Sequence, residues 1–192
     1  MYSKLSIITS VILVTAAILT VQSSMIQPSY AQLDANSQTA ILNMHNQERA
    51  AVGVPQVTWS NSLATDAQNW AQYLASLNLR PANWQTGFPG DIPPHSQFST
   101  NGGQGENLAW GTPRGAYSAA NLAQGWADER SNYVPGTPVG NGGTYPNIYG
   151  HYTQMVWRST TEIGCGIASD ANQDYLVCRY LPAGNYRTQA PY

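Results

Sequence analysis

The sequence predicts an α+β domain whose strands form an antiparallel sheet, and two observations indicate this fold class. Apolar side chains recur every three or four positions through much of the first half of the chain, which is the spacing of amphipathic helices. Near the C-terminus, the apolar runs 163–168 and 175–180 flank the polar turn 169–174, as in a β-hairpin. Helices placed before and between strands of this kind are typical of an α+β domain.

Two helices are expected before the first long loop. Ser37 can cap the first helix, and Gly53 followed by Pro55 can end it. Its predicted inner face consists of Ile41, Met44, Glu48 and Ala51. Ser60 can cap the second helix, which has the clearest periodicity in the chain. Its predicted inner face consists of Leu63, Ala67, Trp70, Leu74 and Leu77.

The middle of the chain alternates between loops and short elements. Residues 78–105 are rich in Pro, Gly, Asn, Ser and Gln, so they are expected to form a long surface loop. A short strand over 106–110 and a helix over 116–133 should follow, before a second loop over 134–147.

The N-terminus has the pattern of a secretion signal. Lys4 precedes the apolar stretch 5–21, and the small residues Ser29 and Ala31 suit a signal peptidase, so residues 1–31 are expected to be removed. The alternative is retention as a membrane anchor, since the apolar stretch approaches the ~17 residues needed to span a bilayer. Cleavage would leave 32–192, about 160 residues, which suits a single domain without a membrane span.

Charge and cysteine content exclude several classes of protein. Lys4 is the only lysine, so the remaining chain carries seven Arg against ten Asp and Glu. This sparse, slightly acidic balance argues against nucleic acid as a partner, and the missing lysine excludes Schiff-base chemistry and phosphate-binding P-loops. We expect a monomer. Cys165 and Cys178 are the only cysteines, so in an exported chain we expect one disulfide between them.

Two long motifs carry a family resemblance. The segment 150–157 reads Gly-His-Tyr-Thr-Gln-Met-Val-Trp, with Thr160 three residues further on, and the segment 175–186 contains Cys178 and Arg179. Supporting motifs are His45-Asn46 with Arg49, Gly105-Glu106-Asn107, and Trp126 with Glu129. Over nearly the whole mature chain, the sequence resembles the CAP superfamily of cysteine-rich secretory, antigen 5 and pathogenesis-related 1 proteins.

The resemblance implies a three-layer α-β-α sandwich with a small antiparallel sheet and a cleft that holds two histidines and two glutamates. Carried over by position, this cleft tetrad would be His95, Glu106, Glu129 and His151. The stretch 97–104 is longer than usual for the family. An inserted loop there could return the His95 ring to the cleft or displace it.

Such a tetrad allows three interpretations. It can be a hydrogen-bonded cluster that joins loops to the sheet. His95 and His151, with carboxylates or water, can hold a divalent cation such as zinc, although no cofactor is expected to be required. It can also exchange protons near neutral pH as an acid-base catalyst. Catalysis has the weakest support, because the sequence contains neither a Gly-x-Ser-x-Gly elbow nor a His-Glu-x-x-His motif, and no catalytic residue is assigned.

Aromatic residues suggest a second kind of site. Trp84, Phe88 and Phe98 stand in the long polar loop and could line a groove for an apolar ligand, or cover the loop itself. By contrast, Trp126 is expected to pack in the core, as its neighbours are apolar. The resemblance implies a structural packing role for His45, at the position of the family's His-Asn pair in the first helix.

These observations support three hypotheses of function. The first is a secreted, extracellular protein that binds a sterol, a fatty acid or an extracellular protein partner through the cleft and its loops. The second is a secreted hydrolase, a peptidase, that uses the tetrad. The third is an extracellular defence or interaction factor, as the plant members of the CAP superfamily suggest.

Overall fold

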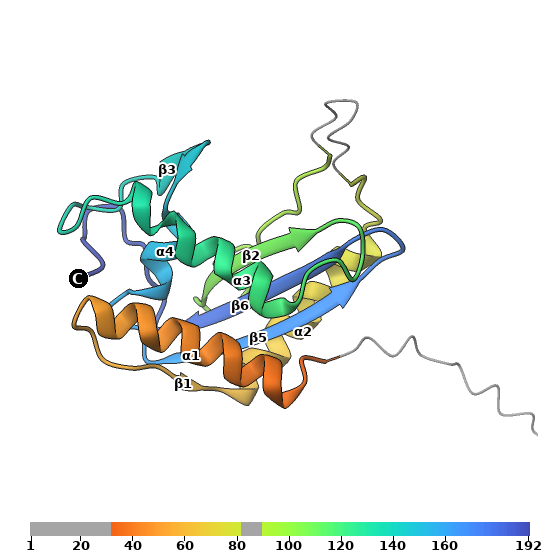
Figure 1. Ribbon diagram of the computed structural model, residues 1–192, viewed down its shortest axis with the longest axis horizontal. Helices are drawn as coiled ribbons and strands as arrows, with labels where there is room; N and C mark the ends of the chain where they lie inside the picture. The colour runs from red at the N-terminus through yellow and green to blue at the C-terminus, as the bar shows by residue number, and fades with distance from the viewer. Residues whose placement is uncertain (1–31, 82–89) are drawn as a thin grey trace, which may run out of the picture.

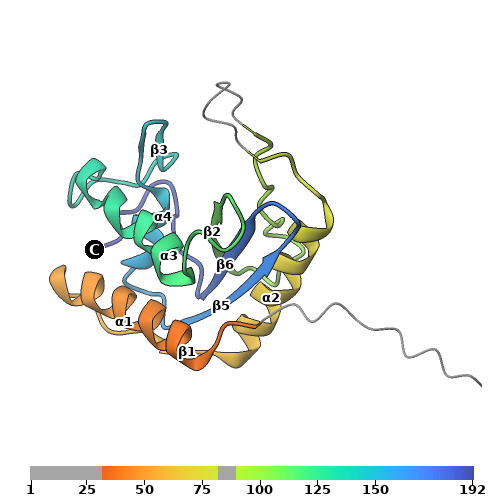
Figure 2. The same cartoon turned by 45° about the vertical axis from the view of Figure 1, so that its right-hand side comes forward.

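The structure is a computed structural model that describes residues 32–81 and 90–192. It has three layers, as predicted, with the sheet in the middle (Figures 1 and 2). Helix α2 (Asn61–Ser76) covers one face, and helices α1 (Ala35–Ala51) and α3 (Ala119–Asp128) cover the other. The predicted leader 1–31 and the predicted groove residues Trp84 and Phe88 lie outside the described residues.

The other elements are short and lie mostly in the second half of the chain. They are β1 (Thr58–Trp59), β2 (Gly105–Gly111), the 3-10 helix η1 (Glu129–Asn132), β3 (Gly143–Thr144), β4 (Asn147–Ile148), α4 (Gly150–Met155), β5 (Glu162–Ser169) and β6 (Asp174–Leu181). Among the described helices, none combines the length and apolar character needed to cross a membrane.

The central sheet has the strand order β1-β5-β6-β2. Strands β5 and β6 form the predicted hairpin, and β2 runs antiparallel to β6. Strand β1 instead runs parallel to β5, with Thr58 opposite Glu162, so the sheet is mixed rather than wholly antiparallel. A two-residue strand shows no alternation, and its partner is far away in sequence, so this pairing leaves no local pattern to detect.

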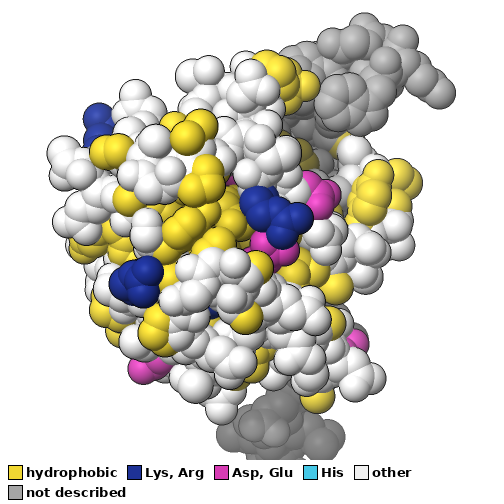
Figure 3. Space-filling view, turned by 60° about the vertical axis from the view of Figure 1, so that its left-hand side comes forward, with side chains coloured by type: hydrophobic (Ala, Val, Ile, Leu, Met, Phe, Trp, Pro, Cys, Tyr) yellow, Lys and Arg dark blue, Asp and Glu magenta, His cyan; other side chains and the backbone are white. Residues whose placement is uncertain are grey.

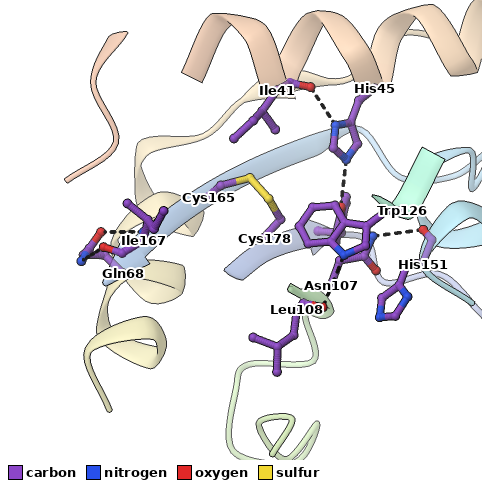
Figure 4. Close-up of a disulfide and its surroundings, with 11 residues drawn as sticks. Ile41, His45, Gln68, Asn107, Leu108, Trp126, His151, Cys165, Ile167 and Cys178 are labelled. Atoms are coloured by element: carbon purple, nitrogen blue, oxygen red, sulfur yellow. Dashed lines mark hydrogen bonds between the residues drawn. A yellow bond between two sulfur atoms is a disulfide. The ribbon is translucent and has the colours of Figure 1, made fainter. Parts of the chain in front are cut away.

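Helix α2 lies unusually close to β5 because two glycines face it. A Cβ added to Gly164 or Gly166 would collide with the backbone of Ala64 or Gln68, respectively. The Gln68 side chain then reaches the strand, donating from Nε2 to Ile167 O (2.9 Å) and accepting from Ile167 N (3.1 Å) (Figure 4). The close approach therefore depends on residues without side chains in the strand.

The N-cap of helix α1 lies three residues before the predicted cap, Ser37. Asp34 is the cap, and its carboxylate accepts a hydrogen bond from Ser37 N at 2.7 Å. The buried stripe of the helix is Ile41, His45 and Arg49 rather than the predicted face, of which Met44 and Glu48 are only half-buried and Ala51 is exposed. The prediction followed apolar residues, whereas this helix buries polar side chains that find partners inside the protein.

His45 has the structural role that was expected. Its ring is fully buried, and Nδ1 lies 2.8 Å from Ile41 O, which can only accept, so Nδ1 carries the proton and donates. Nε2 therefore accepts from the hydroxyl of Tyr180 at 2.9 Å (Figure 4). These two bonds satisfy the neutral ring and join α1 to β6.

Helix α3 is shorter than the predicted 116–133. It starts after Ser118, whose side chain forms a capping box with Asn121. It ends at Asp128 and is followed directly by η1. The predicted disulfide is present: Cys165 and Cys178 are direct partners in the β5–β6 register and are bonded to each other (Figure 4). The bridge therefore joins the two central strands beneath α1 and α3.

Candidate functional site

The first half of the predicted tetrad lies at the start of edge strand β2. His95 Nδ1 lies 2.6 Å from Glu106 Oε1, which also accepts from Ser96 N at 3.0 Å. The Ser96 hydroxyl donates to Glu106 Oε2 at 2.8 Å. The long loop therefore returns His95 to the carboxylate, and Glu106 is what holds the loop end in place.

Glu106 is also paired with a buried cation. It lies opposite Arg179 in the β2–β6 register, and Arg179 Nη2 is 3.0 Å from Glu106 Oε2. Burial alone would raise the pKa of Glu106, but the hydrogen bond from His95, the charge of Arg179 and the hydroxyl of Ser96 outweigh it and lower the pKa below its ordinary value. Glu106 is therefore held as a carboxylate at neutral pH and cannot serve there as a proton donor.

The second half of the tetrad joins η1 to α4. His151 Nδ1 lies 2.5 Å from Glu129 Oε1, while Glu129 Oε2 accepts from the backbone amides of His151 (2.9 Å) and Tyr152 (3.2 Å). These amides belong to the first turn of α4, which has no neighbouring helical carbonyl to bind them. One buried carboxylate thus orients the His151 ring and caps its helix.

Two further side chains position His151. The ring lies nearly parallel to the indole of Trp126, with centroids 6.3 Å apart and 22° between the planes. Trp126 is itself held in the core, where Nε1 donates to Leu108 O at 3.3 Å. Asn107 Nδ2 donates to His151 O at 3.0 Å (Figure 4). Strand β2 therefore positions His151 in two ways: Asn107 binds its backbone carbonyl, and Leu108 holds the indole beside its ring.

The two His–Glu pairs approach β2 from opposite faces of the sheet. Glu106 points to the α2 face, like Arg179, whereas the next residue, Asn107, points to the α3 face and His151. His95, Glu106 and His151 nevertheless line one polar cavity of about 260 Å³, together with loop residues such as Asn141 and Asn185. Glu129 lies behind His151 and lines the neighbouring cavity instead.

The predicted zinc site stays a prediction. In residues 32–81 and 90–192, no three His, Cys, Asp or Glu side chains form a group that could hold a metal ion. The Nδ1 atoms of His95 and His151 each face a carboxylate, so their Nε2 atoms are the imidazole ligands that remain. Two imidazoles would need carboxylate oxygens or waters to complete a tetrahedral zinc shell.

The peptidase hypothesis remains a prediction with little support from this geometry. Hydrolysis through a covalent step needs a nucleophile hydrogen-bonded to a base that a third group orients. The Ser96 hydroxyl, the closest candidate in sequence, donates to the same carboxylate that engages His95. The pair is thus arranged as two donors on one acceptor rather than as a nucleophile and its base.

An apolar cavity lies next to the tetrad, between β2 and α3. It has a volume of about 430 Å³. Its apolar lining includes Trp110, Tyr117, Leu122 and Trp126, and Glu129 and His151 lie at its polar part. The sequence did not predict this cavity. Trp126 is a core residue, and Trp110 and Tyr117 flank the turn 111–115, which is rich in Gly and Pro and has no apolar pattern that would indicate a groove.

Of the aromatic groove predicted in the long loop, only Phe98 falls in the described residues. Its side chain is 58% exposed and packs against Gly103 of the same loop. Phe98 does not line the apolar cavity beside the tetrad. The groove of Trp84, Phe88 and Phe98 therefore stays a prediction, and the apolar cavity among the described residues lies between β2 and α3.

Comparison with known proteins gives consistent results. A sequence model of the cysteine-rich secretory protein family, CAP, matches residues 42–180. Pathogenesis-related protein 1A of Nicotiana tabacum is 38% identical over 160 residues, covering 82% of each chain. Human cysteine-rich secretory protein 2 is 38% identical over 167 residues, covering 81% of this chain and 60% of that protein.

Solved structures share the fold. The crystal structure of NaASP2 with Zn²⁺ superposes with a TM-score of 0.67 at 24% identity, covering 83% of this chain and 86% of that one. The venom allergen-like protein 4 of Schistosoma mansoni gives a TM-score of 0.55 at 25% identity, covering 83% of this chain and 95% of that one. These similarities extend over the layers that surround the tetrad.

Proposed function

Because the chain belongs to the cysteine-rich secretory protein family, CAP, we propose that it is an extracellular binding protein for an apolar ligand with a small polar head, such as a sterol. The observation that carries this proposal is the apolar cavity between β2 and α3. Its volume of about 430 Å³ lies within the ~300–1,000 Å³ typical of ligand pockets.

The lining of the cavity supports a ligand that is mostly apolar. Trp110 and Tyr117 are exposed, so they offer apolar surface to water in the absence of a ligand, whereas Leu122 is buried at the base of the lining. Burying such surface is favourable by about 25 cal/mol per Å². On the face drawn in Figure 3, hydrophobic side chains gather near the centre, with a few Lys, Arg, Asp and Glu side chains around them. Apolar contact rather than charge therefore dominates recognition.

The polar part of the cavity favours a hydroxyl over a carboxylate. His151 donates from Nδ1 to Glu129, so Nε2 of the neutral ring is the nitrogen that can accept a hydrogen bond from a ligand hydroxyl. A fatty-acid carboxylate would instead approach the charged Glu129 in the same cavity. We therefore expect a sterol to bind more tightly than a fatty acid.

The proposal is tested by titrating the purified protein with fluorescent cholesterol and with a fluorescent fatty acid. Saturable binding of the sterol is expected, weakened about tenfold by Tyr117→Ala or Trp110→Ala through loss of apolar contact. Tyr145→Ala is the matched control, because that side chain is 86% exposed and lies in the turn between β3 and β4. Absence of saturable binding, or equal binding by all variants, refutes the proposal.

A second candidate function comes from the relatives. Several of them, from Nicotiana tabacum, Hordeum vulgare and Arabidopsis thaliana, are named pathogenesis-related proteins. A defence or interaction role outside the cell is consistent with these names and with the disulfide, which persists in oxidising compartments. The test is to measure secretion of the protein and its expression in the presence of other organisms. Retention inside the cell would contradict this role.

A further inference from the structure

A second cavity, on the opposite face of the sheet from the apolar one, has a different chemistry. It lies between α2 and the loop that follows His95, and its volume is about 440 Å³. Polar side chains dominate its lining, which includes Asp66, Asn69, Asn101, Gln104 and Arg179, and two aromatic residues of α2, Trp70 and Tyr73, form one wall. Neither the tetrad nor the apolar cavity accounts for these residues.

Arg179 is an incompletely paired cation in this wall. Only 3% of the residue is exposed, and Nη2 is paired with Glu106. The Nε and Nη1 atoms are buried and have no hydrogen-bond acceptor among the described residues. Burial lowers the pKa of Arg179, and the charges of Glu106 and Asp66 offset that effect only in part. Buried unpaired donors are uncommon, so these two call for a partner.

Gln104, in the same cavity wall, has a buried hydrogen-bond acceptor without a donor in the described part of the chain. Its Nε2 atom donates to Asp66 Oδ2 at 2.7 Å, which fixes the orientation of the amide because a carboxylate can only accept. This orientation leaves Oε1 buried, without a donor among the described residues. The cavity wall therefore contains unpaired donors on Arg179 and an unpaired acceptor on Gln104.

A hydroxyl group satisfies both deficits, because it donates one hydrogen bond and accepts others. Arg179 and Gln104 both line the cavity, so rotation of their side chains would bring these buried atoms to a ligand there. Charge argues for a neutral ligand. An anion would face Asp66 and Glu106, while a cation would face the guanidinium of Arg179.

The aromatic wall indicates what else the ligand presents. The Trp70 and Tyr73 rings are 4.7 Å apart between centroids and tilted by 34°, and Tyr73 is 46% exposed. Trp70 Nε1 donates to Pro94 O at 3.3 Å, which fixes the indole against the loop. A fixed indole and an adjacent tyrosine ring beside planar amide and carboxylate groups suit a ring-shaped molecule with an apolar face and a hydroxylated edge.

We infer that this cavity is a binding site for a neutral saccharide, whose hydroxyl groups pair with Arg179, Gln104 and Asp66 while its ring face packs on Trp70 and Tyr73. The site is separate from the proposed sterol cavity and does not depend on it, because β2 and the sheet lie between the two.

The experiment is a titration of the full secreted protein with neutral tetrasaccharides of glucose, mannose and N-acetylglucosamine, followed by the indole N–H signals in NMR spectra. At least one of the three is expected to bind saturably. Tyr73→Ala and Gln104→Leu should each weaken that binding about tenfold. Tyr73 is half-exposed, so its replacement should leave the fold intact, which the spectrum itself reports.

Matched variants separate the two cavities. Tyr117→Ala and the exposed Tyr145→Ala should leave saccharide binding unchanged, whereas Tyr73→Ala should leave sterol binding unchanged. The inference is overturned if none of the tetrasaccharides binds saturably at millimolar concentration, or if Tyr73→Ala binds as tightly as the wild type. Tighter binding of tetragalacturonate than of every neutral probe would also overturn it, since the cavity would then be an anion site.

Discussion

Arg49 of α1 donates a hydrogen bond from Nη1 to the backbone carbonyl of Met155, the last residue of α4, at 3.0 Å. The same guanidinium reaches Trp157 O (2.9 Å) from Nη1 and Thr160 O (2.9 Å) from Nη2. Since α4 carries His151, this buried cation fixes the end of the helix whose beginning Glu129 caps. The His151 segment is thus held at both ends by charged side chains from other parts of the chain.

Arg49→Met should therefore destabilise the protein strongly. The substitution removes the guanidinium donors from three buried carbonyls, of which Trp157 O keeps the hydrogen bond from Thr160 N. We expect the free energy of unfolding to fall by about 3–5 kcal/mol. Urea unfolding followed by tryptophan fluorescence measures this change. Arg130→Met is the control, because its ion pair with Glu48 is largely exposed, and it should cost less than about 1 kcal/mol. Equal losses for the two variants would show that Arg49 does not hold α4.

The elements predicted from sequence are those with a local pattern. Helix α2, strand β2 and the β5–β6 hairpin were predicted with small errors at their ends, because apolar periodicity reports which side of an element is buried. The predicted inner face of α1 was wrong because apolar periodicity cannot indicate a helix face that buries polar side chains. His45 and Arg49 are polar in sequence, and only their distant partners, Tyr180 and Met155, make them core residues.

The candidate site likewise has some features that the sequence predicts and others that depend on the fold. Family motifs named the four tetrad residues, and the structure brings each histidine to a glutamate. What sequence could not supply was that the two pairs approach β2 from opposite faces, which depends on strand alternation and register. Arg179 lies inside a motif that indicates the family but carries no local pattern of a cavity, and its cavity results from the packing of α2 against the loop after His95.

His45 predicts a stability loss in mild acid. Burial lowers its pKa from 6.5 to about 4, so between these two values the unfolded state binds more protons than the folded state. Stability is then complete above pH 6.5 and falls as the pH drops towards 4, by roughly 3 kcal/mol in total at 1.36 kcal/mol per pKa unit. Melting temperatures measured in this window should show the decline.

His45→Gln is the variant that isolates this effect. It removes the titrating ring while keeping a donor and an acceptor, so it should be less stable than the wild type at pH 7.5 but should show a flatter profile between pH 6.5 and 4. Glu106 affects only the acid end of the comparison, since its pKa is lowered from 4.5 and the stability it contributes is lost only as the pH falls below that unfolded value. Parallel profiles for wild type and variant would assign the acid sensitivity to other groups.

Gly105, the first residue of β2, should not tolerate a side chain. An added Cβ would collide with the Gln154 side chain, which cannot move freely because its Oε1 accepts from Gly184 N at 2.9 Å. We expect Gly105→Ala to cost about 1–3 kcal/mol by overpacking. Gly125 in α3 is the control, as nothing lies within 4 Å of its added Cβ, and Gly125→Ala should stabilise the helix by about 0.5–1 kcal/mol. Thermal unfolding that ranks the two variants the other way would contradict this packing.

Glu129→Gln tests whether the carboxylate that caps α4 also prepares His151 for a ligand. The amide has one acceptor oxygen where the carboxylate has two, so its NH₂ group must face either the His151 Nδ1 proton or the amides of His151 and Tyr152. Stability should fall by about 1–3 kcal/mol, and sterol affinity should fall as well because the ring loses its fixed orientation. Glu48→Gln is the control, because the partner of Glu48, Arg130, is 60% exposed; it should cost less than about 1 kcal/mol and leave sterol affinity unchanged. If Glu129→Gln lowers stability while sterol affinity stays at the wild-type value, the carboxylate only caps the helix, and the polar head of the ligand does not depend on His151.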